Sequence, residues 1–200
     1  MPQMLAAWLE SCTDVSSILN CTLDRCLALT GTRRGNIQLM DWTSGHLEIA
    51  AQHGFDHEFL KFFARVRADD GSACGRALAA REAIIVNDVE RDKAFSPASR
   101  SIVLGSGIRA VQSMPLISTS GALVGMLSVH FGTVRYPAVS ELMIMKTLAQ
   151  TAANAVIAQR ARVAEPVRRS LDLIASSKAL LRQIARDEEM RTGGALTTSD

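Results

Sequence analysis

The stretch GSGIRAVQSMPLISTSGALVGMLSVHF, residues 105–131, decides the fold of this chain. Two runs rich in apolar and β-branched residues, Ala110–Ser118 and Ala122–Phe131, flank the small polar turn Thr119-Ser120-Gly121. Such runs around a short polar turn are typical of a β-hairpin. Both alternating sets of side chains in the second run are largely apolar, so we expect the hairpin at the centre of a sheet that is covered on both faces.

Polar side chains interrupt these apolar strands at a few positions. Gln112 and Ser113 lie in the first strand, and Ser128 and His130 lie in the second. Polar groups on a buried strand need hydrogen-bond partners, which come either from the protein or from a bound molecule. Their amide, hydroxyl and imidazole groups suit a polar small molecule. Side chains that are satisfied within the core are the alternative interpretation.

The composition is that of an ordinary globular domain. The 200 residues are 48% hydrophobic and 21% charged, and the net charge of +2 favours neither a nucleic acid nor a membrane partner. Apolar runs are shorter than the roughly 18 residues of a membrane-spanning helix, and the N-terminus lacks the basic region of a secretory signal. Four cysteines without CxxC spacing, Cys12, Cys21, Cys26 and Cys74, indicate a reduced, cytoplasmic protein.

Local patterns place the other helices and strands. Helical spacing over residues 4–29 predicts an N-terminal helix with the stripe Trp8, Cys12, Val15, Leu19, Leu23 and Cys26, and Thr13 or Asp14 is a candidate cap for a restart within it. Further strands are expected at 36–42, 46–53 and 83–87. Short helices that start near capping residues are expected at 56–66, 72–81 and 96–104.

Two helices are expected after Pro137. The first runs to Pro166, and the second covers 167–187 with near-heptad spacing of Val167, Leu171, Ile174, Lys178, Leu181 and Ala185. We therefore expect a helical extension over 163–190 and a flexible tail over 191–200. The whole order predicts an α+β fold, with a mostly antiparallel sheet and helices on both faces.

The order of these elements and five segments of sequence resemble the GAF family of sensor domains over residues 14–162. The segments are LTGTRRGNIQLMD, AAQHGF, GSACGRALAAREAIIVNDV, GIRAVQSMPLISTSGALVGMLSVHF and ELMIMKTLAQTAANAV. The resemblance implies a GAF/PAS-like fold with a central six-stranded antiparallel sheet, in a bacterial sensor domain over 1–162. It implies terminal helices on one face, which often form a parallel dimer bundle, and a pocket on the other face under the helices 72–81 and 96–104.

The resemblance also suggests which residues face the pocket and which ligands they suit. The candidate ligand-binding residues are Cys74, Asp88, Phe95, Gln112, Ser113, Ser128 and His130. The Asn-Lys-Phe-Asp-Glu signature of cyclic-nucleotide-binding members has no counterpart in the segment IVNDVERDKAF, so we do not expect cyclic GMP. Cys74 has no neighbouring histidine for a bilin, and haem at His130 would need a large apolar slot, so we expect neither cofactor.

Two of these candidates have a plain structural alternative. Cys74 lies near a helix N-terminus, where the helix dipole lowers the pKa of a thiol, which predicts a redox-sensing or ligand-contacting residue. The alternative is a small residue packed in a tight glycine turn. Asp88 either belongs to a lid over the pocket or lies in a solvated charged loop.

Three functions remain open at this point. The first is a regulatory domain, homodimeric through its terminal helices, that binds an unidentified small molecule and passes ligand or redox state to a signalling partner. The second is a thiol enzyme related to free methionine sulfoxide reductases, because Ser-Ala-Cys-Gly at Cys74 resembles their motif; however, the loop FSPASRSIVLG lacks the second sulfur that exchange requires. The third is a structural dimerisation module without ligand.

Other enzyme classes are excluded by missing motifs. The chain has no GxSxG and no phosphate-binding glycine loop, and no histidine follows His130 to serve as the phospho-acceptor of a histidine kinase.

Overall fold

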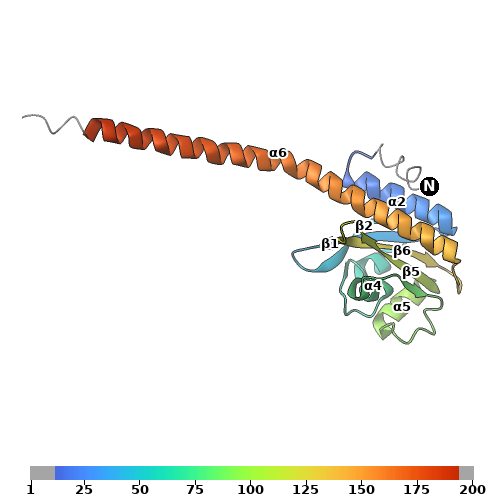
Figure 1. Ribbon diagram of the computed structural model, residues 1–200. Helices are drawn as coiled ribbons and strands as arrows, with labels where there is room; N and C mark the ends of the chain where they lie inside the picture. The colour runs from blue at the N-terminus through green and yellow to red at the C-terminus, as the bar shows by residue number, and fades with distance from the viewer. Residues whose placement is uncertain (1–11, 194–200) are drawn as a thin grey trace, which may run out of the picture. The chain divides into compact units, whose positions relative to one another are not determined.

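The computed structural model describes residues 12–193 and contains a six-stranded sheet with the strand order β3-β2-β1-β6-β5-β4 (Figure 1). All strand pairs are antiparallel, so the predicted α+β class and sheet are confirmed. The strands are β1 (Arg34–Asp41), β2 (His46–His53), β3 (Arg65–Val66), β4 (Ile84–Val86), β5 (Ala110–Ile117) and β6 (Leu123–Phe131).

The predicted hairpin β5–β6 lies at the centre of the sheet. The strands pair from Ala110 opposite Phe131 to Ile117 opposite Leu123, and every residue of β6 is buried. On its other side β6 pairs with β1, where the backbones approach closely at Gly125. A Cβ atom at Gly125 would lie 2.1 Å from the carbonyl oxygen of Gln38. Only glycine therefore fits this crossing.

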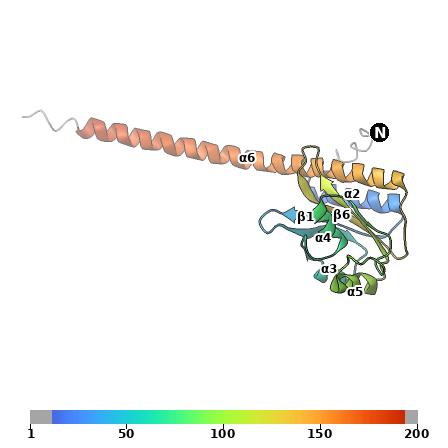
Figure 2. The same cartoon turned by 60° about the horizontal axis from the view of Figure 1, so that its bottom comes forward.

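Terminal helices cover one face of the sheet. Helix α2 (Val15–Thr30) and the part of α6 (Val139–Gly193) up to Gln159 lie side by side there (Figures 1 and 2). Their side chains share one core cluster with the strands, which includes Leu19, Leu23, Ile37, Leu127, Val129, Met145, Ala149 and Ala152. The three buried alanines of α6, Ala149, Ala152 and Ala153, let that helix pack closely on the strands.

Three short helices cover the other face: α3 (His57–Phe62), α4 (Ala73–Ala80) and α5 (Pro97–Gly105). In Figure 2, α4 and α5 lie on the opposite side of the sheet from α2. Each helix begins after a predicted cap, whose side chain accepts a backbone N–H three residues ahead, at 2.8 Å for Asp56, 3.0 Å for Ser72 and 3.2 Å for Ser96. The caps explain why these short helices start where they do.

The N-terminal helix begins later than the sequence pattern indicates. Asp14 caps it and accepts the N–H of Ser17 at 2.7 Å, while the Ser17 hydroxyl accepts the N–H of Asp14 at 3.3 Å. This capping box satisfies the first free N–H groups, so the helix starts at Val15 and the prediction is wrong for residues 12–14. Residues 4–11 of the predicted helix lie outside the described residues. Val66, predicted on the helix at 56–66, lies in β3 opposite Leu47.

The predicted break at Pro166 is also wrong, because α6 continues through it. Proline removes one backbone hydrogen bond inside a helix. All side chains over 160–187 are exposed, so water can satisfy the carbonyl group that loses its partner. The chain divides into one unit that ends at Gln159 and a second that begins at Arg160. Of the predicted tail, residues 191–193 are helical and 194–200 lie outside the described part.

No helix within residues 12–193 combines the length and the apolar composition needed to cross a bilayer.

We expect the substitution Gly125→Ala to lower the free energy of unfolding by about 3 kcal/mol, because the new methyl group meets a backbone oxygen that cannot move without breaking the β1–β6 pairing. Urea unfolding followed by circular dichroism measures this. The matched control is Gly105→Ala, where nothing lies within 4 Å of the added carbon and a helical alanine stabilises. Equal stability of the two variants would contradict the tight crossing.

Candidate functional site

A cavity lies between the sheet and the short helices, as the resemblance implied. Its volume is about 20 Å³, which is room for about one water-sized group. Strands β1, β5 and β6 form its floor, and α3, α4, α5 and the segment before α5 cover it. Its lining consists of Asn36, Gln38, Phe59, Phe63, Ser72, Ala73, Cys74, Phe95, Val103, Val111 and His130.

Four polar side chains of this lining are almost fully buried: Ser72, which caps α4, and Asn36, Gln38 and His130. The exposed fractions are 2% for Asn36, 1% for Gln38 and 3% for His130. Gln38 Nε2 donates to the carbonyl oxygen of Phe63 at 3.3 Å. Among the described residues, however, Asn36 Oδ1, Gln38 Oε1 and His130 Nδ1 have no hydrogen-bond partner. A buried polar atom without a partner costs about 1–3 kcal/mol, so a molecule that bonds to these atoms would recover that free energy.

His130 is held as a neutral imidazole. Burial, together with the smaller effect of the positive charge of Arg34, lowers its pKa to about 3. The ring meets Phe55 and Phe59 edge-on, with centroid distances of 4.9 Å and 5.6 Å. At neutral pH the ring therefore offers one N–H donor and one nitrogen acceptor.

Cys74 joins a buried hydrogen-bond cluster with two serines. Its Sγ lies 3.2 Å from Ser128 Oγ and 3.6 Å from Ser113 Oγ, and the two hydroxyl oxygens lie 2.9 Å apart. Burial raises the pKa of the Cys74 thiol. The prediction of a lowered pKa is therefore wrong, because desolvation outweighs the N-terminal field of a short helix. Cys74 lines the cavity as a thiol, and both serines lie behind it.

Gln112 does not reach the cavity. In the β5–β6 register it pairs with Val129, whose side chain lies in the core cluster under α2 and α6. Directly opposite residues share a face of the sheet, so the Gln112 amide points toward the terminal helices. Its prediction as a ligand-binding residue is corrected here: the neighbouring Ser113 is the one that faces the short helices.

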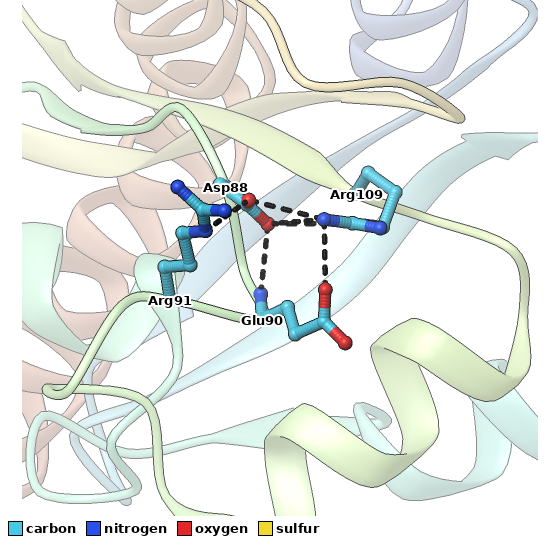
Figure 3. A network of polar contacts seen from close by, with 4 residues as sticks. All are labelled: Asp88, Glu90, Arg91 and Arg109. Atoms are coloured by element: carbon cyan, nitrogen blue, oxygen red, sulfur yellow. Dashed lines mark hydrogen bonds and ion pairs between the residues drawn. The ribbon is translucent and has the colours of Figure 1, made fainter.

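Asp88 is also outside the cavity lining and belongs to a charged network at one end of β4 and β5 (Figure 3). Arg109 Nη2 donates to its two carboxylate oxygens at 2.9 Å and 3.0 Å, and contacts Glu90 Oε2 at 2.9 Å. The hydrogen bond from Arg109 lowers the pKa of Asp88. A backbone hydrogen bond joins the same two segments, because the N–H of Val89 donates to the carbonyl oxygen of Arg109 at 2.7 Å. This network fastens the short edge strand to the sheet.

The structure thus brings together part of the predicted set. Cys74, Phe95 and His130 line the cavity, and Ser113 and Ser128 contact it through Cys74. The sequence analysis missed Asn36 and Gln38, although both alternate with the apolar Ile37 and Leu39 in a strand-like run, which was the available signal. Within the described residues, no group of three or more His, Cys, Asp or Glu side chains could hold a metal ion.

Acidification from about pH 7 to about pH 5 is expected to lower the free energy of unfolding by about 2 kcal/mol through His130 alone. Its pKa is about 3 in the fold and 6.5 when unfolded, so the unfolded state takes up the proton first and stability falls with pH below 6.5. Urea titrations at both pH values measure the loss. His130→Phe should remove it while keeping an aromatic ring, and His53→Gln, at an exposed position, should not. An unchanged pH dependence in His130→Phe would contradict the burial argument.

Three solved structures share this fold. Free methionine-R-sulfoxide reductase from Neisseria meningitidis, in complex with its substrate, is 19% identical with a TM-score of 0.65, covering 80% of this chain and 87% of that one. The phycocyanobilin-bound GAF domain from a cyanobacterial phytochrome is 18% identical with a TM-score of 0.62, covering 80% and 94%. A GAF domain/HD domain protein from Geobacter sulfurreducens is 19% identical with a TM-score of 0.63, covering 74% and 95%.

No curated protein matches this sequence. The family model of the GAF domain matches residues 12–156, which is most of the chain and nearly the span of the resemblance in the sequence. The match includes α2, all six strands and most of the first unit. The chain therefore belongs to the GAF domain family.

Proposed function

We propose that this chain is a regulatory GAF domain that binds a small uncharged molecule. The structural change caused by binding is communicated to a partner protein through α6 of a homodimer. The observation that carries the proposal is the set of unpartnered polar atoms of Asn36, Gln38 and His130 in one buried cavity. A phytochrome GAF domain and a GAF domain/HD domain protein among the similar structures agree with a regulatory role.

The lining favours an uncharged ligand that donates hydrogen bonds. Asn36 Oδ1 and Gln38 Oε1 only accept hydrogen bonds, so the ligand must supply N–H or O–H groups. Among the described lining residues there is no Asp, Glu, Lys or Arg, and His130 is neutral. An ionised ligand would therefore lose its hydration without gaining a counter-charge. Phe59, Phe63 and Phe95 add apolar contacts to such a ligand.

The small volume of the cavity sets a condition on binding. A ligand larger than one water-sized group requires the covering segments to move, and the cover belongs to short helices rather than to the sheet. The same volume favours a second candidate function, a structural dimerisation module whose cavity is filled by its own side chains. A rise in melting temperature with ligand concentration distinguishes the ligand-binding domain from the structural module.

The reductase alternative gains no support from the geometry around Cys74. Its thiol is buried, its pKa is raised, and its neighbours are the hydroxyl groups of Ser113 and Ser128. The other three cysteines lie in or against the core cluster of the opposite face. Thiol–disulfide exchange needs a second sulfur in reach, and no other cysteine of the described residues lies on the cavity face.

The dimer is argued from apolar side chains that α6 exposes beyond Gln159. They are Val163, Val167, Leu171, Leu173, Ile174, Leu180, Leu181 and Ile184. Val167, Ile174 and Leu181 recur every seven residues, as in helices that pack against each other. A ligand shifts such an assembly only if it binds two arrangements with different affinity. The cavity and α6 are joined by β6, whose alternate side chains reach both faces.

Acetamide and acetate, which have nearly the same shape, test the ligand class. We expect acetamide to raise the melting temperature of the full chain in a concentration-dependent way, and acetate to leave it unchanged, because only the amide donates hydrogen bonds without a charge. Asn36→Leu should weaken acetamide binding about tenfold, while the exposed Gln52→Leu should not. If neither acetamide nor simple alcohols raise the melting temperature, the structural-module function is favoured instead.

Sedimentation velocity tests the dimer. We expect the full chain to sediment with the mass of two copies, and Ile174→Asp with Leu181→Asp to give one copy, because two carboxylates would be buried in an apolar seam. Ser176→Asp is the matched control, since Ser176 lies on the other side of α6 from Ile174. A single-copy mass for the unmodified chain at micromolar concentration would rule out the homodimer.

A further inference from the structure

A second hollow in the first unit lies at the edge of the sheet, beside α6. Its volume is about 560 Å³, compared with about 20 Å³ for the cavity under the short helices, and the two share no lining residue. Sites for small molecules typically measure roughly 300–1,000 Å³. We call this hollow the edge groove, and it is lined by the link 81–83 between α4 and β4, by Met114, Pro115 and Ile117 of β5, and by Lys146 and Gln150 of α6.

The backbone of β5 is open on the side where β4 lies. Strand β4 pairs with β5 only from Val111 to Ser113, whereas β6 pairs with β5 as far as Ile117. Within the described part of the chain, residues 114–117 form no backbone–backbone hydrogen bond outside that pairing. Pro115 fits such a position, because proline lacks an N–H and in sheets is confined to open edges. An extended chain placed here would find unsatisfied backbone groups to pair with.

Two unpaired charges of opposite sign line the edge groove. Lys146 and Glu82 are exposed, and among the described residues neither side chain has a polar partner. They come from different elements and form no ion pair with each other. A ligand that carries both an ammonium and a carboxylate group would pair with each of them. Met114, which is 4% exposed, adds an apolar surface for the rest of the ligand.

The link that carries Glu82 has a defined conformation. Arg81 ends α4 with φ 56° and is the one residue other than glycine with positive φ in the described part of the chain. Its Nη2 donates to the carbonyl oxygen of Gly121, in the turn between β5 and β6, at 2.7 Å. The guanidinium of Arg81 is therefore anchored to that turn, which leaves Lys146 as the lining cation without a partner.

We propose that the edge groove binds a short peptide with free termini. The peptide backbone pairs with the open edge of β5, and its side chains contact Met114 and Pro115. Its terminal ammonium pairs with Glu82, and its terminal carboxylate pairs with Lys146. Two or three extended residues separate these termini by about 7–11 Å, as two lining charges that do not pair directly require. The site goes beyond the proposed function and does not depend on it.

Isothermal titration calorimetry of the full chain with the tripeptide alanyl-leucyl-alanine tests the site. Two modified peptides isolate the termini, since the N-acetyl form lacks the ammonium group and the C-terminal amide lacks the carboxylate. We expect each modification to weaken binding about tenfold, because each removes one hydrogen bond between charged groups. Equal affinity of the three peptides, or no binding of the unmodified peptide at millimolar concentration, would overturn the proposal.

Variants assign each terminus to one side chain. Lys146→Met should weaken binding of the unmodified peptide about tenfold and leave the affinity of the C-terminal amide unchanged, because that peptide has no carboxylate to lose. Glu82→Gln should act in the same way on the unmodified and the N-acetyl peptide. Lys178→Met, at an exposed position of the second unit, is the matched control and should change neither affinity. Equal losses for all three peptides in either groove variant would refute the assignment.

Amide hydrogen exchange locates the bound peptide. We expect alanyl-leucyl-alanine to slow exchange within residues 114–117, because new backbone hydrogen bonds protect the open edge. Asn36→Leu, which is expected to weaken acetamide binding in the cavity, should leave the affinity for the peptide unchanged. This variant distinguishes failure of the edge groove from failure of the cavity. Protection of the cavity lining without protection of residues 114–117 would place the peptide elsewhere and refute the proposal.

Discussion

The burial of strand β6 on both faces is the constraint on which this structure depends. All nine of its residues are buried, and it hydrogen-bonds to β1 on one side and β5 on the other. A strand in this position cannot leave polar side chains to water. Ser128 and His130 must therefore find partners inside the protein or in a bound molecule, and the two solve this differently. Ser128 bonds to Ser113 and Cys74, whereas His130 Nδ1 has no partner among the described residues.

The register of the strands brings the polar side chains together on one face of the sheet. Asn36, Ser128 and Ser113 lie opposite one another on three neighbouring strands, so one polar row crosses the face that α4 covers. Gln38 and His130 extend the polar surface on the two sides of this row. No ionised side chain lines the cavity within the described residues, so the lining offers hydrogen-bonding groups and phenylalanine rings. The charges gather instead at the strand ends, where Asp88 and Arg109 fasten β4 to β5.

The same strand gives a physical route between the faces. Along β6, Met126, Ser128 and His130 point toward the short helices, and Leu127, Val129 and Phe131 pack under α2 and α6. Neighbouring residues of one strand cannot shift independently. A molecule that displaces His130 therefore acts on Val129 and Phe131 as well. A tightly packed layer of leucine, valine and alanine side chains lies between this strand and the terminal helices, and it is the layer through which the proposed function would act.

The sequence by itself determined what is local. The caps Asp56, Ser72 and Ser96 and the turn at 119–121 fix helix starts and the central hairpin through contacts between residues a few positions apart. Tertiary structure decided the rest. The side chain of Gln112 points away from the cavity because the register of β5 places it on the other face of the sheet. Desolvation raises the pKa of Cys74, although its position near a helix N-terminus predicted a lowered pKa. Solvent around Pro166 allowed one continuous helix. Each of these outcomes depends on which distant groups surround a residue, and local spacing does not encode that.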